Sequence, residues 1–110
     1  MIFTKEHVEM FRSGRKTVTR RIWKTPHVKV GGIYGVRSDR FKPVSPDAPR
    51  IRVISVSVER LRDITLEEVQ REGHTSISEF MEVWEKLHDG VWNPNQKVYR
   101  IEFELIGDAQ

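Results

Sequence analysis

Apolar residues recur at helical spacing in the C-terminal half of the chain. Five of them fall on one stripe of a helix: Ile77, Phe80, Met81, Trp84 and Leu87. Ser76 and Glu79 have the spacing of a capping box, and Asp89-Gly90 ends the pattern. The pattern predicts a helix from Ser76 to about Asp89, with the stripe turned toward the core.

Two shorter helices are predicted upstream. Thr65 and Glu68 repeat the capping-box spacing, and the pattern that they open stops at Gly73. Near the N-terminus, Thr4 is placed to cap a helix over about Lys5 to Ser13. Gly14 follows it as a residue that can end a helix in the left-handed conformation.

Alternating or β-branched runs predict the strands. Four runs qualify: Thr17–Trp23, Ile33–Val36, Ile51–Leu61 and Val98–Ile106, with Ile2-Phe3 as a candidate for a short edge strand. The last run alternates cleanly and is predicted to be half-buried. In the third run the apolar positions change phase between Val53 and Ile54, which predicts a β-bulge or a bend at a barrel corner.

The order of these elements favours an α+β fold in a single domain over residues 1–110. A bulged long strand and antiparallel-type connections favour a small curved sheet or barrel with flanking helices. Residues 38–50 carry three prolines and are expected to form a long irregular loop. That loop is either a rim beside the basic segment or an ordinary surface loop.

Composition excludes several classes of protein. The chain has no cysteine, which removes disulfides and thiolate metal sites and fits an intracellular, cytoplasmic protein. No apolar run approaches the ~18 residues of a membrane helix, and the first residues lack the apolar region of a signal peptide. The four histidines show no metal-ligand spacing. We therefore expect no membrane, no metal and no cofactor, and a monomer is assumed.

Positive charge is concentrated in one third of the chain. Between Met10 and Ser38 lie eight of the nineteen lysines and arginines and none of the sixteen acidic residues. Such a one-sided field suits a phosphate-bearing partner, RNA or a nucleotide, unless neighbours in the fold neutralise it.

The centre of this basic third is Gly14–Arg21, with the sequence Gly-Arg-Lys-Thr-Val-Thr-Arg-Arg. Strand alternation sends Lys16, Val18 and Arg20 to one face and Thr17, Thr19 and Arg21 to the other. Six residues are candidates for contact with RNA or a nucleotide: Arg15, Thr17, Arg20, Arg21, Trp23 and Phe41, the last two as stacking surfaces for a base. The plainer interpretation of each is a solvated charge or a packing residue.

Glu72 is placed unfavourably, because the end of a helix already carries partial negative charge. A cation would explain the placement, and Lys16 is a natural candidate. Lys16 is either a phosphate-binding ammonium or a base whose pKa is lowered by its arginine neighbours. A base beside a hydroxyl such as that of Thr19 is a recognised way to activate a nucleophile. The plainer alternatives are a solvated acid and a structural hydroxyl.

These residues, in this order, resemble the ASCH domain family of the PUA-like superfamily. The resemblance is carried by the Gly14–Arg21 segment, the turn into Ile33-Tyr34, the run Arg60–Thr65, Glu72-Gly73 and the closing Tyr99–Phe103. It implies a β-barrel of about five to six strands with flanking helices and a cleft lined by Gly14–Arg21. It also implies binding or processing of RNA.

A small group within that family is similar in size and hydrolyses the acetyl amide of acetylated cytidine. The resemblance to it implies that Thr19 is a nucleophile, Lys16 its activating base, and Glu72 the group that orients or charge-balances the lysine. Arg21 matches a further arginine of the cleft. The loops at 38–50 and 92–96 depart from the family pattern and change the rim of the cleft.

Three hypotheses of function result. The first is a module that binds RNA or a nucleoside in a basic cleft. The second is an amidohydrolase acting on acetylated cytidine or a similar modified nucleoside. The third is a structural or protein-interaction module that uses Trp92 and the proline-rich loop as its contact surface.

Overall fold

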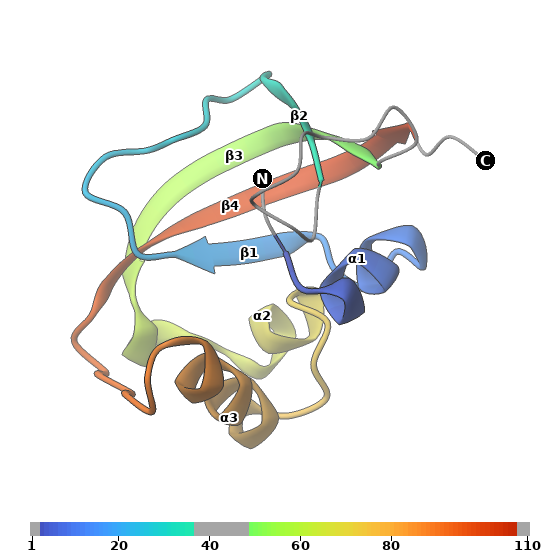
Figure 1. The fold of residues 1–110 in the computed structure, drawn as a ribbon. Coiled ribbons are helices and arrows are strands. Elements are labelled where there is room, and N and C mark those ends of the chain that lie inside the picture. The colour runs from blue at the N-terminus through green and yellow to red at the C-terminus, as the bar shows by residue number, and fades with distance from the viewer. Residues whose placement is uncertain (1–2, 37–48, 108–110) are drawn as a thin grey trace.

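The computed structural model of the chain describes residues 3–36 and 49–107 (Figure 1). In chain order the elements are α1 (Lys5–Arg12), β1 (Val18–Arg21), β2 (Ile33–Gly35), β3 (Arg50–Arg60), the 3-10 turn η1 (Leu61–Asp63), α2 (Leu66–Arg71), α3 (Ile77–Leu87) and β4 (Lys97–Gly107). Each predicted helix and each of the four predicted strand runs begins within about one residue of its predicted position. The α+β class is therefore confirmed.

The four strands form one antiparallel sheet in the order β1-β4-β3-β2. The long strands β3 and β4 bend together, so the sheet curls into a half-barrel, as Figure 1 shows. The predicted count of five to six strands was too high for the described residues. The chain between β1 and β2 adds no strand, and Phe3 is buried in the core without joining the sheet.

The β-bulge predicted in β3 is present. Val53 pairs with Phe103 and Ser55 with Glu102, so Ile54 is the extra residue. Beyond the bulge, Val56 pairs with Ile101 and Val58 with Tyr99, which places the even-numbered valines on the face of the buried β4 residues, as the phase change indicated. Val58 nevertheless remains 54% exposed.

Two apolar clusters hold the molecule together. The first lies within the curl of the sheet and includes Ile51, Val53, Ile101 and Phe103. The second packs α2 and α3 against the sheet through Leu61, Val69, Phe80, Trp84 and Val98. Phe80 and Trp84 are therefore core residues, as the helical stripe predicted, whereas Ile77 and Leu87 at the two ends of α3 are exposed.

The caps read from the sequence fix where the helices begin. The Oγ1 of Thr4 accepts from His7 N at 3.2 Å, and the Oγ1 of Thr65 accepts from Glu68 N at the same distance. The Oγ of Ser76 accepts from Glu79 N at 3.0 Å. Gly14 follows α1 with φ +76° and Gly73 follows α2 with φ +99°. These turns place Lys16 and Glu72 at the ends of α1 and α2.

Most of the proline-rich stretch at 38–50 falls outside the described residues, and Arg50, its last member, begins β3. In the two described segments, no helix has the length and apolar character needed to cross a bilayer.

Candidate functional site

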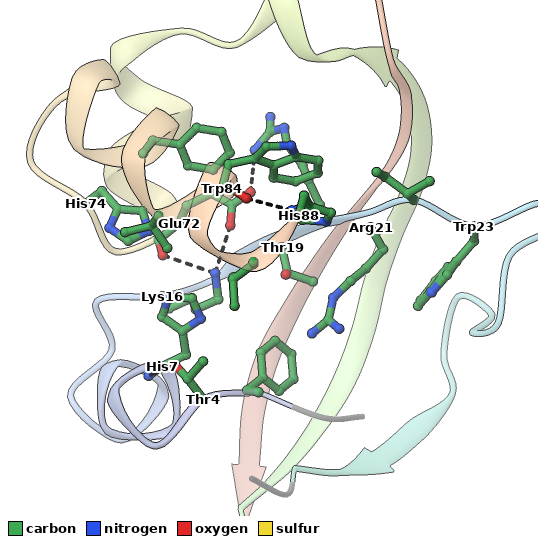
Figure 2. Close-up of a pocket in the computed structure, with 16 residues that line it drawn as sticks. Thr4, His7, Lys16, Thr19, Arg21, Trp23, Glu72, His74, Trp84 and His88 are labelled. Atoms are coloured by element: carbon green, nitrogen blue, oxygen red, sulfur yellow. Dashed lines mark hydrogen bonds and ion pairs between the residues drawn. The ribbon is translucent and has the colours of Figure 1, made fainter. Parts of the chain in front are cut away.

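A cleft of about 680 Å³ opens between β1 and the helices (Figure 2). One wall is formed by β1 and its flanks: Lys16, Thr19, Arg20, Arg21, Ile22 and Trp23. The other wall is α3, through Phe80, Val83, Trp84, Leu87 and His88. The N-terminal segment adds Phe3, Thr4 and His7, and the turn after α2 adds Glu72 and His74. The predicted basic segment therefore lines a cavity shared with α3.

Lys16 and Glu72 meet in this cleft. Lys16 Nζ lies 2.8 Å from Glu72 Oε1 and donates a second hydrogen bond to the backbone oxygen of Glu72 at 3.1 Å. Both side chains are almost fully buried. The backbone brings them together, because Thr17 N donates to Arg71 O at 2.8 Å and so ties the basic segment to the end of α2. The cation partner predicted for Glu72 is thus present.

Burial lowers the pKa of Lys16 below its ordinary value of 10.5. The Glu72 carboxylate acts in the opposite direction, and the nearby charges of Arg21 and Arg20 add to the lowering. Lys16 therefore gives up its proton more readily than an exposed lysine, which a general base requires.

Arg20 holds the second oxygen of Glu72. Its Nη1 donates to Glu72 Oε2 at 3.1 Å, its Nη2 donates to Glu68 Oε1 at 2.7 Å, and its Nε pairs with Glu59. Burial disfavours the guanidinium charge, but these three carboxylates outweigh it and raise the pKa of Arg20. The guanidinium has no exposed surface, and its partners are carboxylates of the protein itself; contact between Arg20 and RNA remains a prediction. Arg20 lies beside Glu72.

The pairing continues outward to β4. Arg20 and Arg100 lie directly opposite each other on β1 and β4, and Glu68 bridges them by accepting from both. The hydrogen bond from Arg100 is the main reason that the pKa of Glu68 falls to about 2. We call Lys16, Arg20, Glu59, Glu68, Glu72 and Arg100 the ion cluster. The sequence does indicate part of this cluster, because the spacing of Glu68 and Glu72 places two carboxylates on one face of a helix.

Thr19 lies on the β1 wall, and Figure 2 shows it between Lys16 and Arg21. Its side chain is buried, at 5% exposure for the residue. Within residues 3–36 and 49–107, its hydroxyl makes no hydrogen bond. A buried hydroxyl without a partner is costly, and here it faces a cavity in which a bound molecule can supply the partner.

Arg21 and Trp23 also line the cleft. The Arg21 guanidinium lies 4.5 Å over the ring of Phe3, and burial lowers the pKa of Arg21 although Glu72 opposes the shift. The Trp23 ring stacks on His27 with a centroid separation of 4.5 Å. Both predicted contact residues therefore line the same cleft as Thr19.

Two further predicted contact residues, Arg15 and Thr17, do not line the cleft. Arg15 is exposed and donates to Gly73 O at 3.1 Å, outside the cleft lining. Thr17 holds β1 in place through its backbone, which bonds Arg71 and Phe103, and its side chain does not line the cleft. Phe41 lies outside the described residues.

Three histidines in the cleft were not predicted as site residues. Burial, followed by the charge of Lys16, lowers the pKa of His7 to about 4, so its imidazole is neutral near pH 7. His74 lies 5.7 Å from His7 between ring centroids and places Nδ1 3.1 Å from Glu79 Oε1. His88 stacks on Trp84. No three potential metal ligands gather within the described part of the chain.

No family model and no curated protein matches the sequence. Solved structures do match. An ASCH domain from Lactobacillus crispatus superposes with a TM-score of 0.73 at 16% identity, over 91% of this chain and 70% of that one. The hypothetical protein PH0355 gives 0.67 at 22% identity, over 94% of both chains. An ASCH protein from Zymomonas mobilis gives 0.62 at 14% identity, over 100% of this chain and 71% of that one.

The chain has the ASCH-domain fold. The family resemblance seen in the sequence is confirmed at the level of fold, including the curled sheet and its flanking helices. In this ASCH fold the cleft is lined by β1, the end of α2 and α3.

Proposed function

We propose that the cleft is the active site of an amidohydrolase that removes an acyl group from a modified nucleoside, with acetylated cytidine as the reference substrate. One observation carries the proposal: the buried Lys16–Glu72 pair lies in the same cleft as Thr19, whose buried hydroxyl has no hydrogen-bond partner among the described residues. The class of substrate comes from the family resemblance, and the size of the cleft suits a single nucleoside.

The first half-reaction transfers the acyl group to Thr19. Neutral Lys16 Nζ takes the hydroxyl proton as Thr19 Oγ1 bonds to the carbonyl carbon of the amide. Arg21, a cation on the same wall, is the candidate to stabilise the negative charge on the carbonyl oxygen. The carbon–nitrogen bond then breaks, and the Lys16 ammonium returns its proton to the departing amino nitrogen. The products are free cytidine and an acyl ester on Thr19.

The second half-reaction restores the enzyme. Lys16 takes a proton from water as the water oxygen bonds to the ester carbon. The ester bond breaks, and the proton passes from Lys16 to Thr19 Oγ1. One amide and one water have become one carboxylic acid and one amine. Glu72 keeps Lys16 in place throughout, because its carboxylate and its backbone oxygen both accept from Nζ.

The test is hydrolysis of acetylated cytidine and a small panel of acylated nucleosides by the purified protein. We expect Thr19→Ala to lose at least about 10³-fold in kcat/KM, because in the proposed mechanism Thr19 carries the acyl ester, whereas the other threonine of the cleft lining, Thr4, caps α1. Thr17→Ala is the matched control, since Thr17 lies two residues away on the same segment but does not line the cleft. Full activity in Thr19→Ala would contradict the assignment of Thr19 as the nucleophile. An absence of turnover across the whole panel would contradict the amidohydrolase proposal.

Binding of RNA is the second candidate, and the placement of Arg21 and Trp23 together on the β1 wall favours it. The ion cluster weighs against it, because Lys16 and Arg20 are paired with carboxylates inside the protein. Salt-sensitive RNA binding that is lost in Arg21→Ala would support this candidate.

A further inference from the structure

A row of aromatic rings lies on the α3 wall of the cleft. It begins at His74, before α3, and continues through Phe80, Trp84 and His88, with centroid separations of 5.9, 6.0 and 3.9 Å. His74 lies two residues after Glu72, so this row begins beside the Lys16–Glu72 pair. From Phe80 to His88 the helix rises by about 12 Å. His88 therefore lies at the end of the cleft away from the proposed catalytic pair.

His88 is held in one orientation at that end. Its Nδ1 lies 2.8 Å from the backbone oxygen of Trp84, and its ring stacks on Trp84 at 3.9 Å with an interplanar angle of 16°. Because a carbonyl oxygen can only accept, Nδ1 carries the hydrogen. In the neutral imidazole Nε2 is then a hydrogen-bond acceptor. No described residue occupies Nε2, and His88 lines the cleft.

We infer that this end of the cleft is a sugar subsite, in which Nε2 of His88 accepts a hydrogen bond from a ribose hydroxyl. The inference rests on the proposed function, which places the acyl amide against Thr19 and Lys16. In an acylated cytidine, the acyl nitrogen and the ribose are attached to opposite atoms of the pyrimidine ring. The ribose then reaches the far end of the cleft, where one of its hydroxyls can donate a hydrogen bond to Nε2 of His88. On the β1 wall, Arg21 and Trp23 lie on the side of Lys16 away from His74, as Figure 2 shows, so both walls extend from the Lys16–Glu72 pair in the direction in which the nucleoside is placed.

The experiment measures binding of two unreactive ligands by calorimetry at pH 8, where an imidazole is ordinarily neutral. Cytidine carries the ribose, and 1-methylcytosine has the same base with a methyl group in its place. His88→Phe keeps a flat ring on Trp84 but removes the acceptor. We expect its affinity for cytidine to fall about three- to tenfold and its affinity for 1-methylcytosine to stay unchanged.

His27→Phe is the matched control. His27 also stacks on a tryptophan, Trp23, at 4.5 Å and 18°, but it does not line the cleft. Its variant should bind both ligands as the wild type does. A thermal melt checks that each variant folds, and His88→Leu, which also lacks the acceptor, replaces His88→Phe if that variant is unfolded.

The outcomes separate the two proposals. The sugar subsite is overturned if wild type does not prefer cytidine to 1-methylcytosine, or if His88→Phe leaves that preference intact. If cytidine binding depends on His88 while no acylated nucleoside is hydrolysed, the subsite stands and the amidohydrolase proposal fails. If hydrolysis depends on Thr19 but the preference for cytidine over 1-methylcytosine is the same in wild type and His88→Phe, the amidohydrolase proposal stands and the sugar subsite fails.

Discussion

Lys16 owes its chemistry to its surroundings. The charged form loses most of its hydration in the cleft, and one carboxylate, that of Glu72, supports it at 2.8 Å. Two acceptors of Glu72 fix the position of Nζ, so the side chain is oriented as well as desolvated. An exposed lysine has neither property, which is why the same residue on a solvated strand would be an ordinary cation.

The pH dependence of hydrolysis tests this account of Lys16. Since the base must be neutral, kcat/KM should rise with pH as Lys16 loses its proton, with a midpoint below 10.5. Glu72 raises the pKa of Lys16, so Glu72→Gln should move the midpoint to lower pH while lowering the plateau rate. A pH–rate profile of acetylated cytidine hydrolysis measures both quantities.

The control for that profile is Glu67→Gln, which changes an exposed carboxylate on the same helix. Its midpoint should match that of the wild type. A midpoint that moves to higher pH in Glu72→Gln would show that the titrating group is not Lys16.

At the scale of single elements, the sequence could predict what is encoded locally. Thr65 and Ser76 cap their helices through contacts that span three residues, and the bulge at Ile54 is visible as a change of phase within one strand. A capping box or an alternation depends only on near neighbours in the chain. These predictions succeeded for that reason.

The site depended on contacts that no local pattern reveals. Lys16 and Glu72 are far apart in sequence and meet only because the basic segment crosses the end of α2. The family resemblance pointed to this pair, whereas residue spacing alone left it open. The carboxylates that pair with Arg20 were not predicted, because the position of a residue on a strand does not show which acidic side chains pack against it. Trp84 was predicted as core only, and it serves the core and the cleft together.

The turn at Gly73 gives a prediction at this scale. Gly73 has φ +99°, and a Cβ there would lie 2.5 Å from Met10 Sδ. Gly73→Ala should therefore reduce the free energy of unfolding by more than the roughly 1 kcal/mol of an unfavourable φ alone, because Met10 must also move. Urea denaturation measures the loss.

Gly14→Ala is the comparison, since Gly14 has φ +76° and open space around its missing Cβ. Gly14→Ala should reduce the free energy of unfolding only by the cost of placing an alanine at a positive φ. Equal losses in the two variants would mean that contact with Met10 has no part in fixing the turn before the cleft.

At the scale of the whole molecule, cationic side chains of the basic third of the chain pair with glutamates from later parts of the sequence. The ion cluster joins β1 to β3, α2 and β4. Arg20 pairs with Glu59 of β3 and Glu68 of α2, and Glu68 also pairs with Arg100 of β4. The net charge of +3 does not reveal this internal pairing. Part of the positive charge of the basic third is neutralised by carboxylates of the protein and does not contribute to the one-sided field that the sequence predicted.

The ion cluster should matter far more to stability than the pairs at the surface. Arg20→Met leaves three carboxylates without their shared cation and should reduce the free energy of unfolding by about 3–5 kcal/mol. Arg52→Met removes a pair with Glu104 in which both side chains are 48% exposed, and it should cost at most about 1 kcal/mol. Similar losses in urea denaturation would contradict the assignment of Arg20.

The position of β4 in the sheet has a consequence for folding. β4 is the last described strand in sequence, yet it lies between β1 and β3, and Val18 pairs with Glu102 across most of the chain. Such a long-range contact forms late and slowly. A ribosome therefore releases β1 long before its neighbour in the sheet exists, and Lys16 likewise has no Glu72 to pair with until α2 and the residue after it have been made. The reactivity proposed for Lys16 is therefore a property of the folded protein, and a chain that is still being made does not have it.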